Sequence, residues 1–100
     1  MISKELLSEL LGCRCSKIKP FGTTRIAYTF LDSPNYVDAT INIYELAYKC
    51  KEWAYGLGVA IDSCHQTAII HFDRKIEIKG DTEPEAIFKA CEWILENKDN

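Results

Sequence analysis

The chain has 100 residues, of which 47% are hydrophobic and 27% are charged, and these are the size and composition of one globular domain. Its formal net charge is -3, so the whole molecule lacks the basic character typical of nucleic-acid-binding domains, although a local basic patch is not excluded. The acidic excess lies in the second half, where residues 51–100 carry six basic and ten acidic groups. A solvated helix face explains such acids without a function.

No run approaches the roughly 20 apolar residues that a membrane span needs. The first residues, Met1–Glu5, open an amphipathic segment that contains acids and do not resemble a signal peptide, so we expect a cytoplasmic protein with no membrane partner. The odd number of cysteines fits free thiols in a reducing compartment better than a disulfide framework. These cysteines are Cys13, Cys15, Cys50, Cys64 and Cys91.

The first third of the chain predicts one helix, a connector and one strand. Ser3 is placed to cap a helix whose leucines recur at spacings of three and four, and Gly12 is placed to end it. Residues 13–22 contain Pro20 and several basic residues and are interpreted as an irregular connector. Apolar and polar residues then alternate over Thr24–Leu31, which predicts a half-buried strand, and a turn follows at Asp32–Asn35.

The second predicted helix follows Asn42, which has Glu45 three residues later in a variant of the capping box, with Thr40 as a rival cap. Apolar residues from Ile43 to Leu57 line one face of this helix. Tyrosines lie on its flank or back, where exposed aromatic side chains can mark an interface, unless the N-terminal segment covers them. These tyrosines are Tyr44, Tyr48 and Tyr55.

Three short strands are predicted next, and the turns between them are tight enough for hairpins, so the sheet should be antiparallel. Their predicted bounds are Val59–Asp62, Gln66–Asp73 and Lys75–Lys79, with Ala68, Ile70 and Phe72 on one face of the middle strand. A capping box at Thr82–Glu85, with Pro84 in the first turn, opens the last helix.

The resulting order is α-β-α-β-β-β-α, which predicts an α+β fold with an antiparallel sheet of about four strands packed with three helices. We expect one domain over residues 1–100, with an N-terminal helix and connector over 1–22, an αβ core over 23–97 and a frayed tail over 98–100. The part from Thr40 to Asn97 has the α-β-β-β-α order of the double-stranded-RNA-binding domain. Its last helix begins with acids at Asp81–Glu85, which would repel phosphates, so that function is not favoured.

The cysteines and histidines show no spacing that is typical of a metal site or a catalytic site. Cys13 and Cys15 are separated by one residue, whereas structural zinc sites use two to four, and Cys64-His65 supplies no matching second pair. The cysteines Cys50 and Cys91 fall on apolar helix faces and are interpreted as small core residues. We therefore predict no metal, no cofactor and no catalytic residue.

Three segments resemble a known family. Glu5–Gly12 is a helix that ends in glycine, Ser33–Asp38 precedes a helix that contains Tyr44-Glu45-Leu46, and Asp81–Ile87 opens the last helix. In this order they resemble the phage ABA sandwich family of small phage and prophage proteins. Cys13 stands where that family has tryptophan, and Val37 interrupts its Tyr-Ser-Thr-Asp turn.

The resemblance implies a phage or prophage origin, a bacterial host and a shared fold, and it implies no catalytic residue. It also implies that Tyr36 and Asp38 belong to a turn that leads into the second helix. The leading functional hypothesis is an accessory protein without enzymatic activity that binds an unidentified protein partner or forms a homo-oligomer. The candidate interface residues are Tyr36, Asp38, Tyr44, Tyr48 and Tyr55.

Two alternatives stay open. The second hypothesis is a small-molecule binder or enzyme that uses the outer face and rim of the sheet near Asp62, Cys64 and His71. The third is nucleic-acid binding through a short basic segment, which would make binding sensitive to salt. The residues of that segment are Arg14, Lys17, Lys19 and Arg25.

Overall fold

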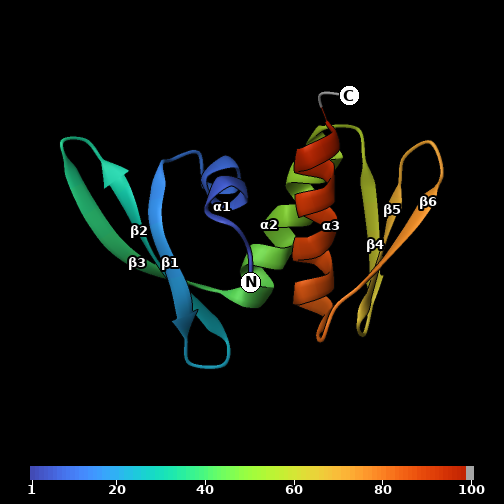
Figure 1. Ribbon diagram of the computed structural model, residues 1–100, viewed down its shortest axis with the longest axis horizontal. Coiled ribbons are helices and arrows are strands. Elements are labelled where there is room, and N and C mark those ends of the chain that lie inside the picture. Colours follow the sequence, from blue (N-terminus) through green and yellow to red (C-terminus); the bar gives the residue numbers. More distant parts are fainter. Residues whose placement is uncertain (99–100) are drawn as a thin grey trace.

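The computed structural model describes residues 1–98 and has three layers, with helices between two antiparallel sheets (Figure 1). The helices are α1 (Lys4–Leu11), α2 (Ile43–Gly56) and α3 (Glu83–Asn97). Sheet A contains β1 (Cys15–Phe21), β2 (Arg25–Asp32) and β3 (Asn35–Asn42). Sheet B contains β4 (Ala60–Cys64), β5 (Thr67–His71) and β6 (Lys75–Lys79).

The α+β class and the three helices are confirmed, whereas a single sheet of about four strands is wrong. Two strands were missing from the prediction, so the observed order is α-β-β-β-α-β-β-β-α. Each sheet is a meander of consecutive strands, in the orders β1-β2-β3 and β4-β5-β6. The predicted α-β-β-β-α order of the second half corresponds to α2, sheet B and α3.

The first missing strand, β1, occupies the segment that was interpreted as an irregular connector. A register shift between Cys15 and Lys17 leaves Cys15 opposite Phe30 and Lys17 opposite Thr29. This β-bulge places Cys15 and Ile18, three residues apart, on the core side of the same strand. The expected spacing of two between inward residues is therefore broken, and the sequence pattern of a strand is lost.

The second missing strand, β3, contains Tyr36 and Asp38, so the predicted role of these residues in a turn before the second helix is wrong. The predicted turn at Asp32–Asn35 lies between β2 and β3 and joins them as a hairpin. Asn42 ends β3 and caps α2 by accepting hydrogen bonds from the backbone N–H groups of Tyr44 and Glu45. Strand and helix thus follow each other without a connecting loop.

The predicted helix caps are confirmed. The Ser3 hydroxyl accepts from the Leu6 N–H at the start of α1, and Thr82 accepts from the Glu85 N–H at the start of α3. Gly12 ends α1 with a φ of 67°, a left-handed conformation that glycine adopts without strain. The frayed tail predicted over 98–100 lies, for residues 99 and 100, outside the described residues.

The core lies between the two sheets and consists of apolar side chains from all three helices and from both sheets. Leu6 and Leu7 of α1, Leu46 of α2 and Ile70 of β5 are fully buried. The prediction that Phe72 lies in the middle strand, on one face with Ala68 and Ile70, is wrong. This residue follows the end of β5, and its side chain is 62% exposed. The outward faces of both sheets are left uncovered by the described residues (Figure 1).

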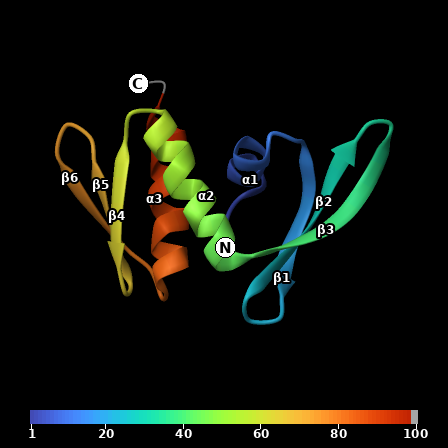
Figure 2. The same ribbon diagram turned by 180° about the vertical axis from the view of Figure 1, so that it is seen from behind.

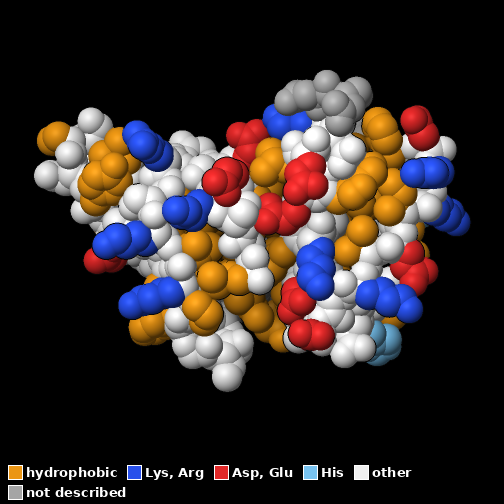
Figure 3. Space-filling model, in the orientation of Figure 1, with side chains coloured by type: hydrophobic (Ala, Val, Ile, Leu, Met, Phe, Trp, Pro, Cys, Tyr) orange, Lys and Arg blue, Asp and Glu red, His pale blue; other side chains and the backbone are white. Residues whose placement is uncertain are grey.

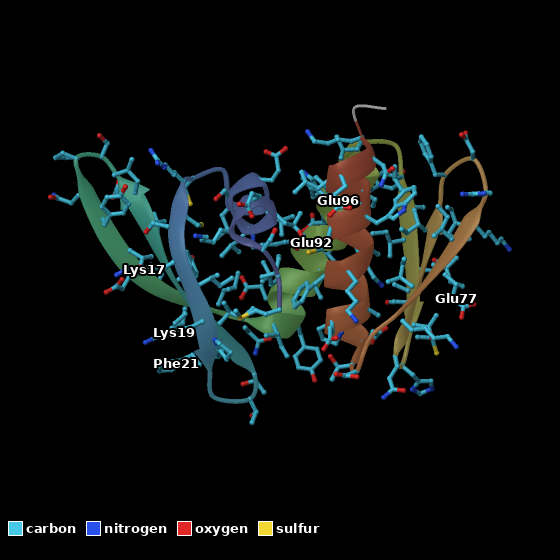
Figure 4. All side chains as sticks on the ribbon, in the orientation of Figure 1. Lys17, Lys19, Phe21, Glu77, Glu92 and Glu96 are labelled. Carbon is cyan, nitrogen blue, oxygen red and sulfur yellow. The ribbon has the colours of Figure 1, made fainter. Side chains whose placement is uncertain are left out.

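The short helix α1 is held in the middle layer by Glu92 of α3. The two Glu92 carboxylate oxygens accept hydrogen bonds from the Ser3 hydroxyl at 2.8 Å and from the Ser3 N–H at 3.1 Å. The same Ser3 hydroxyl oxygen caps α1, so one carboxylate fixes both the start of α1 and its place beside α3. Glu92 and Glu96 lie on the side of α3 toward α1 (Figure 4).

Glu92→Ala should lower the free energy of unfolding by about 1–3 kcal/mol, because it removes two partly buried hydrogen bonds to Ser3. Glu96→Ala is the matched control one turn later on α3 and should change stability by less than about 0.5 kcal/mol. Urea denaturation followed by circular dichroism measures both values. Equal effects of the two substitutions would show that Glu92 does not anchor α1.

Candidate functional site

The clearest exposed apolar feature is a line of three tyrosines along α2, which we call the tyrosine stripe. Tyr44, Tyr48 and Tyr55 are 60%, 63% and 76% exposed, although tyrosines in a folded domain are more commonly half-buried or buried. The opposite side of α2 carries the buried residues Leu46 and Ala54. The sequence left open whether the N-terminal segment covers these rings, and the structure leaves them exposed.

The tyrosine stripe lies beside β4, an edge strand of sheet B that pairs only with β5 in the described part of the chain (Figure 2). Two shallow depressions line the boundary between α2 and sheet B. One of about 340 Å³ is bordered by Tyr55, Lys51 and Ile61, and one of about 140 Å³ by Tyr44, Tyr48 and Lys51. Lys51 borders both depressions, and the smaller one also reaches Glu83 and Pro84 at the start of α3.

The other two predicted interface residues lie elsewhere. Tyr36 and Asp38 are on β3 in sheet A, separated from the tyrosine stripe by the chain from Ala39 to Ile43. Asp38 Oδ1 accepts a hydrogen bond of 2.6 Å from the Thr29 hydroxyl on the neighbouring strand. The five predicted residues therefore belong to two different surfaces.

The basic residues of the third hypothesis are brought together by sheet A. Lys17 lies opposite Thr29, and Lys19 lies opposite Ala27, so both lysines share the outer face with the odd-numbered residues of β2, including Arg25. The backbone oxygen of Arg14 accepts from the Leu31 N–H just before β1, which places Arg14 at the end of this face. Lys17, Lys19 and Phe21 project from β1 away from α1 (Figure 4).

The residues of the enzyme hypothesis lie on the outer face of sheet B. His71 Nε2 is 2.8 Å from Asp62 Oδ2 across β4 and β5, and the exposed Cys64 lies further along β4. These three side chains border none of the four main depressions of the described surface. A histidine–aspartate contact on an open strand surface needs no catalytic explanation.

Cys50 and Cys91 are buried in the core, as the sequence predicted, and they lie against each other, with Cys91 Sγ 3.5 Å from the Cys50 carbonyl oxygen. The Cys91 thiol and the burial of the site together raise the pKa of Cys50 far above that of a free thiol. Burial also raises the pKa of Cys15. Over residues 1–98 no group of three or more His, Cys, Asp or Glu side chains is arranged to hold a metal ion.

Thiol-reactive probes should therefore modify Cys64 first, because it is the exposed cysteine and reaction requires an accessible thiolate. Cys50 and Cys91 should react only when the protein unfolds. Iodoacetamide labelling of the native protein at neutral pH, followed by peptide mass spectrometry over time, measures the order. Modification of Cys50 as fast as Cys64 would contradict the buried position of Cys50, and the same experiment in urea supplies the unfolded reference.

No helix within residues 1–98 is both long enough and apolar enough to cross a membrane. No family model, no curated protein and no solved structure matches this chain. The resemblance to the phage ABA sandwich family thus stays a prediction, and the function is argued below from the surfaces of the molecule alone.

Proposed function

We propose that this protein acts by binding another polypeptide through the tyrosine stripe of α2 and the adjacent free edge of β4. The single observation that carries this proposal is the exposure of Tyr44, Tyr48 and Tyr55 along one line of a helix whose other side is buried. Tyrosine offers a large rigid contact area and a polar hydroxyl, and it is enriched in the energetically dominant positions of interfaces.

The area of the tyrosine stripe is consistent with part of an interface. Given their exposed fractions, the three rings offer roughly 400 Å² for burial, and a standard interface buries about 800 Å² on each partner. The edge of β4, beside Tyr55 and Lys51, can supply the remainder if the partner adds an extended strand there. Such strand addition provides backbone hydrogen bonds, while the two depressions beside α2 can accommodate alternate side chains of the partner.

A second copy of this chain is the first partner to test, since β4 of each copy could extend sheet B of the other across a two-fold axis. A protein from the bacterial host or its phage is the alternative partner, and the phage or prophage origin remains part of this proposal. The small-molecule or enzyme alternative stays a prediction without a pocket at Asp62, Cys64 and His71 to support it.

The double substitution Tyr48→Ser/Tyr55→Ser should weaken self-association or partner binding by about tenfold or more, because it removes two exposed anchors without changing charge or core. Tyr36→Ser is the matched control, an exposed tyrosine on sheet A that should leave binding unchanged. Light scattering coupled to size-exclusion chromatography across a concentration series measures self-association.

If the protein is a monomer at every concentration, the three forms are compared as baits with lysate of a phage-carrying host. A protein retained by the wild type and by Tyr36→Ser, and lost with the double variant, supports the proposal. A monomer that retains no protein in this pattern contradicts it.

A further inference from the structure

A different surface carries an inference that does not depend on the tyrosine stripe. We propose that the outer face of sheet A binds single-stranded nucleic acid. This face is defined by the strand register, which aligns alternate residues of the three strands on the side away from the helices. Its side chains, with Arg14 at its end, are Arg14, Lys17, Lys19, Phe21, Arg25, Ala27, Thr29, Leu31, Tyr36, Asp38 and Thr40.

Three hydrogen bonds between β2 and β3 confirm that residues of these two strands share this face. The Arg25 guanidinium donates from Nε to the Thr40 hydroxyl at 3.0 Å and from Nη2 to the Thr40 carbonyl at 3.3 Å. The Thr29 hydroxyl donates to Asp38 Oδ1 across β2 and β3. The register of β1 against β2, with Lys17 opposite Thr29 and Lys19 opposite Ala27, extends the same face onto the third strand.

The charge of this face is opposite to that of the whole molecule. Four cationic side chains lie on it against one carboxylate, that of Asp38, which is already engaged by Thr29. In Figure 3 most charged side chains over the sheet A end are cationic, acidic side chains gather over α1 and α3, and both signs are mixed over the sheet B end. A Debye length of about 8 Å at physiological ionic strength screens acids across a molecule 43 Å long, so the local sign decides what approaches the sheet.

Aromatic rings accompany the cations at opposite corners of the face. Phe21 and Tyr36 are each 54% exposed, one at the end of β1 and the other near the start of β3. Phe21 lies opposite Arg25, and Tyr36 lies opposite Leu31. Arg25 and Leu31 are six residues apart on β2, a distance of about 20 Å along an extended strand. Lys17 and Lys19 lie on β1 between these two ends.

The surface beside Phe21 and the two lysines of β1 is hollowed. A depression of about 980 Å³ is bordered by Lys17, Lys19, Phe21 and Asp38 among others, and Lys4 of α1 adds a further cation at its margin. A flexible polyanion with exposed planar groups fits these features, since its phosphates meet the cations while unpaired bases stack on the rings. A duplex keeps its bases stacked inside the helix and cannot use Phe21 and Tyr36 in this way.

The test is the fluorescence anisotropy of labelled oligothymidylate and oligouridylate with the full chain over a series of salt concentrations. If four cations each neutralise a phosphate, the logarithm of the observed association constant should fall linearly with the logarithm of the salt concentration, with a slope of about −2.8. Lys17→Glu/Lys19→Glu should weaken binding at least tenfold and flatten the slope by about 1.4. Lys75→Glu/Lys79→Glu makes the same charge change on sheet B and should bind like the wild type.

Phe21→Ala separates stacking from charge. It should weaken binding about 5- to 100-fold without changing the salt slope, because a base loses its aromatic partner while every cation stays. Circular dichroism of each variant verifies folding, and amide chemical shifts of the wild type on titration should change along β1 to β3 rather than in sheet B.

The proposal is overturned by no binding of either oligonucleotide at low salt, by equal loss in the Lys75/Lys79 control, by equal affinity for a duplex, or by equal affinity for polyglutamate. The last result would assign the surface to acidic polypeptides. Shifts confined to α2 and β4 would also overturn it, since they would place the nucleic acid on the other surface.

Discussion

The fold depends on one constraint, which is that a single layer of helices must cover the apolar faces of two separate sheets. Each sheet has three strands, and sheets of this size are stable only when one face is packed against something else. Helix α3 lies against all three strands of sheet B, α2 contacts β3 and β4, and α1 lies against β1. With all three helices used between the sheets, no described element remains to cover either outer face.

The short helix α1 connects sheet A to the other two helices. Eight residues are too few to form a stable helix alone, so α1 depends on Leu6 and Leu7 in the core and on the bonds between Ser3 and Glu92. In return, α1 fills the space between sheet A and the α2–α3 pair. Sheet A would otherwise be joined to the rest of the molecule chiefly where β3 continues into α2.

The sequence was a good guide where structure is decided locally. The caps Ser3, Asn42 and Thr82 bond to backbone groups within three residues, and the apolar faces of α2 and α3 repeat with the period of the helix. The position of Cys50 and Cys91 in the core followed from the same period, whereas the exposure of the tyrosine stripe was left open by the sequence.

Prediction from the sequence failed where the burial of a strand depends on elements distant in the chain. In β1 a bulge breaks the alternation between Cys15 and Ile18, and outward lysines make the segment resemble a loop. In β3 the hairpin extends beyond the helices, so Tyr36 to Asp38 are exposed on both faces and show no alternation. Because these strands were not predicted, most of the basic residues were assigned to a connector, and their common face on sheet A was missed.

The uneven charge along the sequence becomes an uneven charge in space because each sheet is built from consecutive strands. Sheet A comes from residues 15–42, before the acidic second half begins, and α3 carries many of the acids from that half. The four cations of sheet A therefore lie apart from the acids of α3, which gives the outer face of sheet A a local excess of positive charge. The net charge of -3 is thus an average over faces of different sign, and the strand register determines which charged side chains share a face.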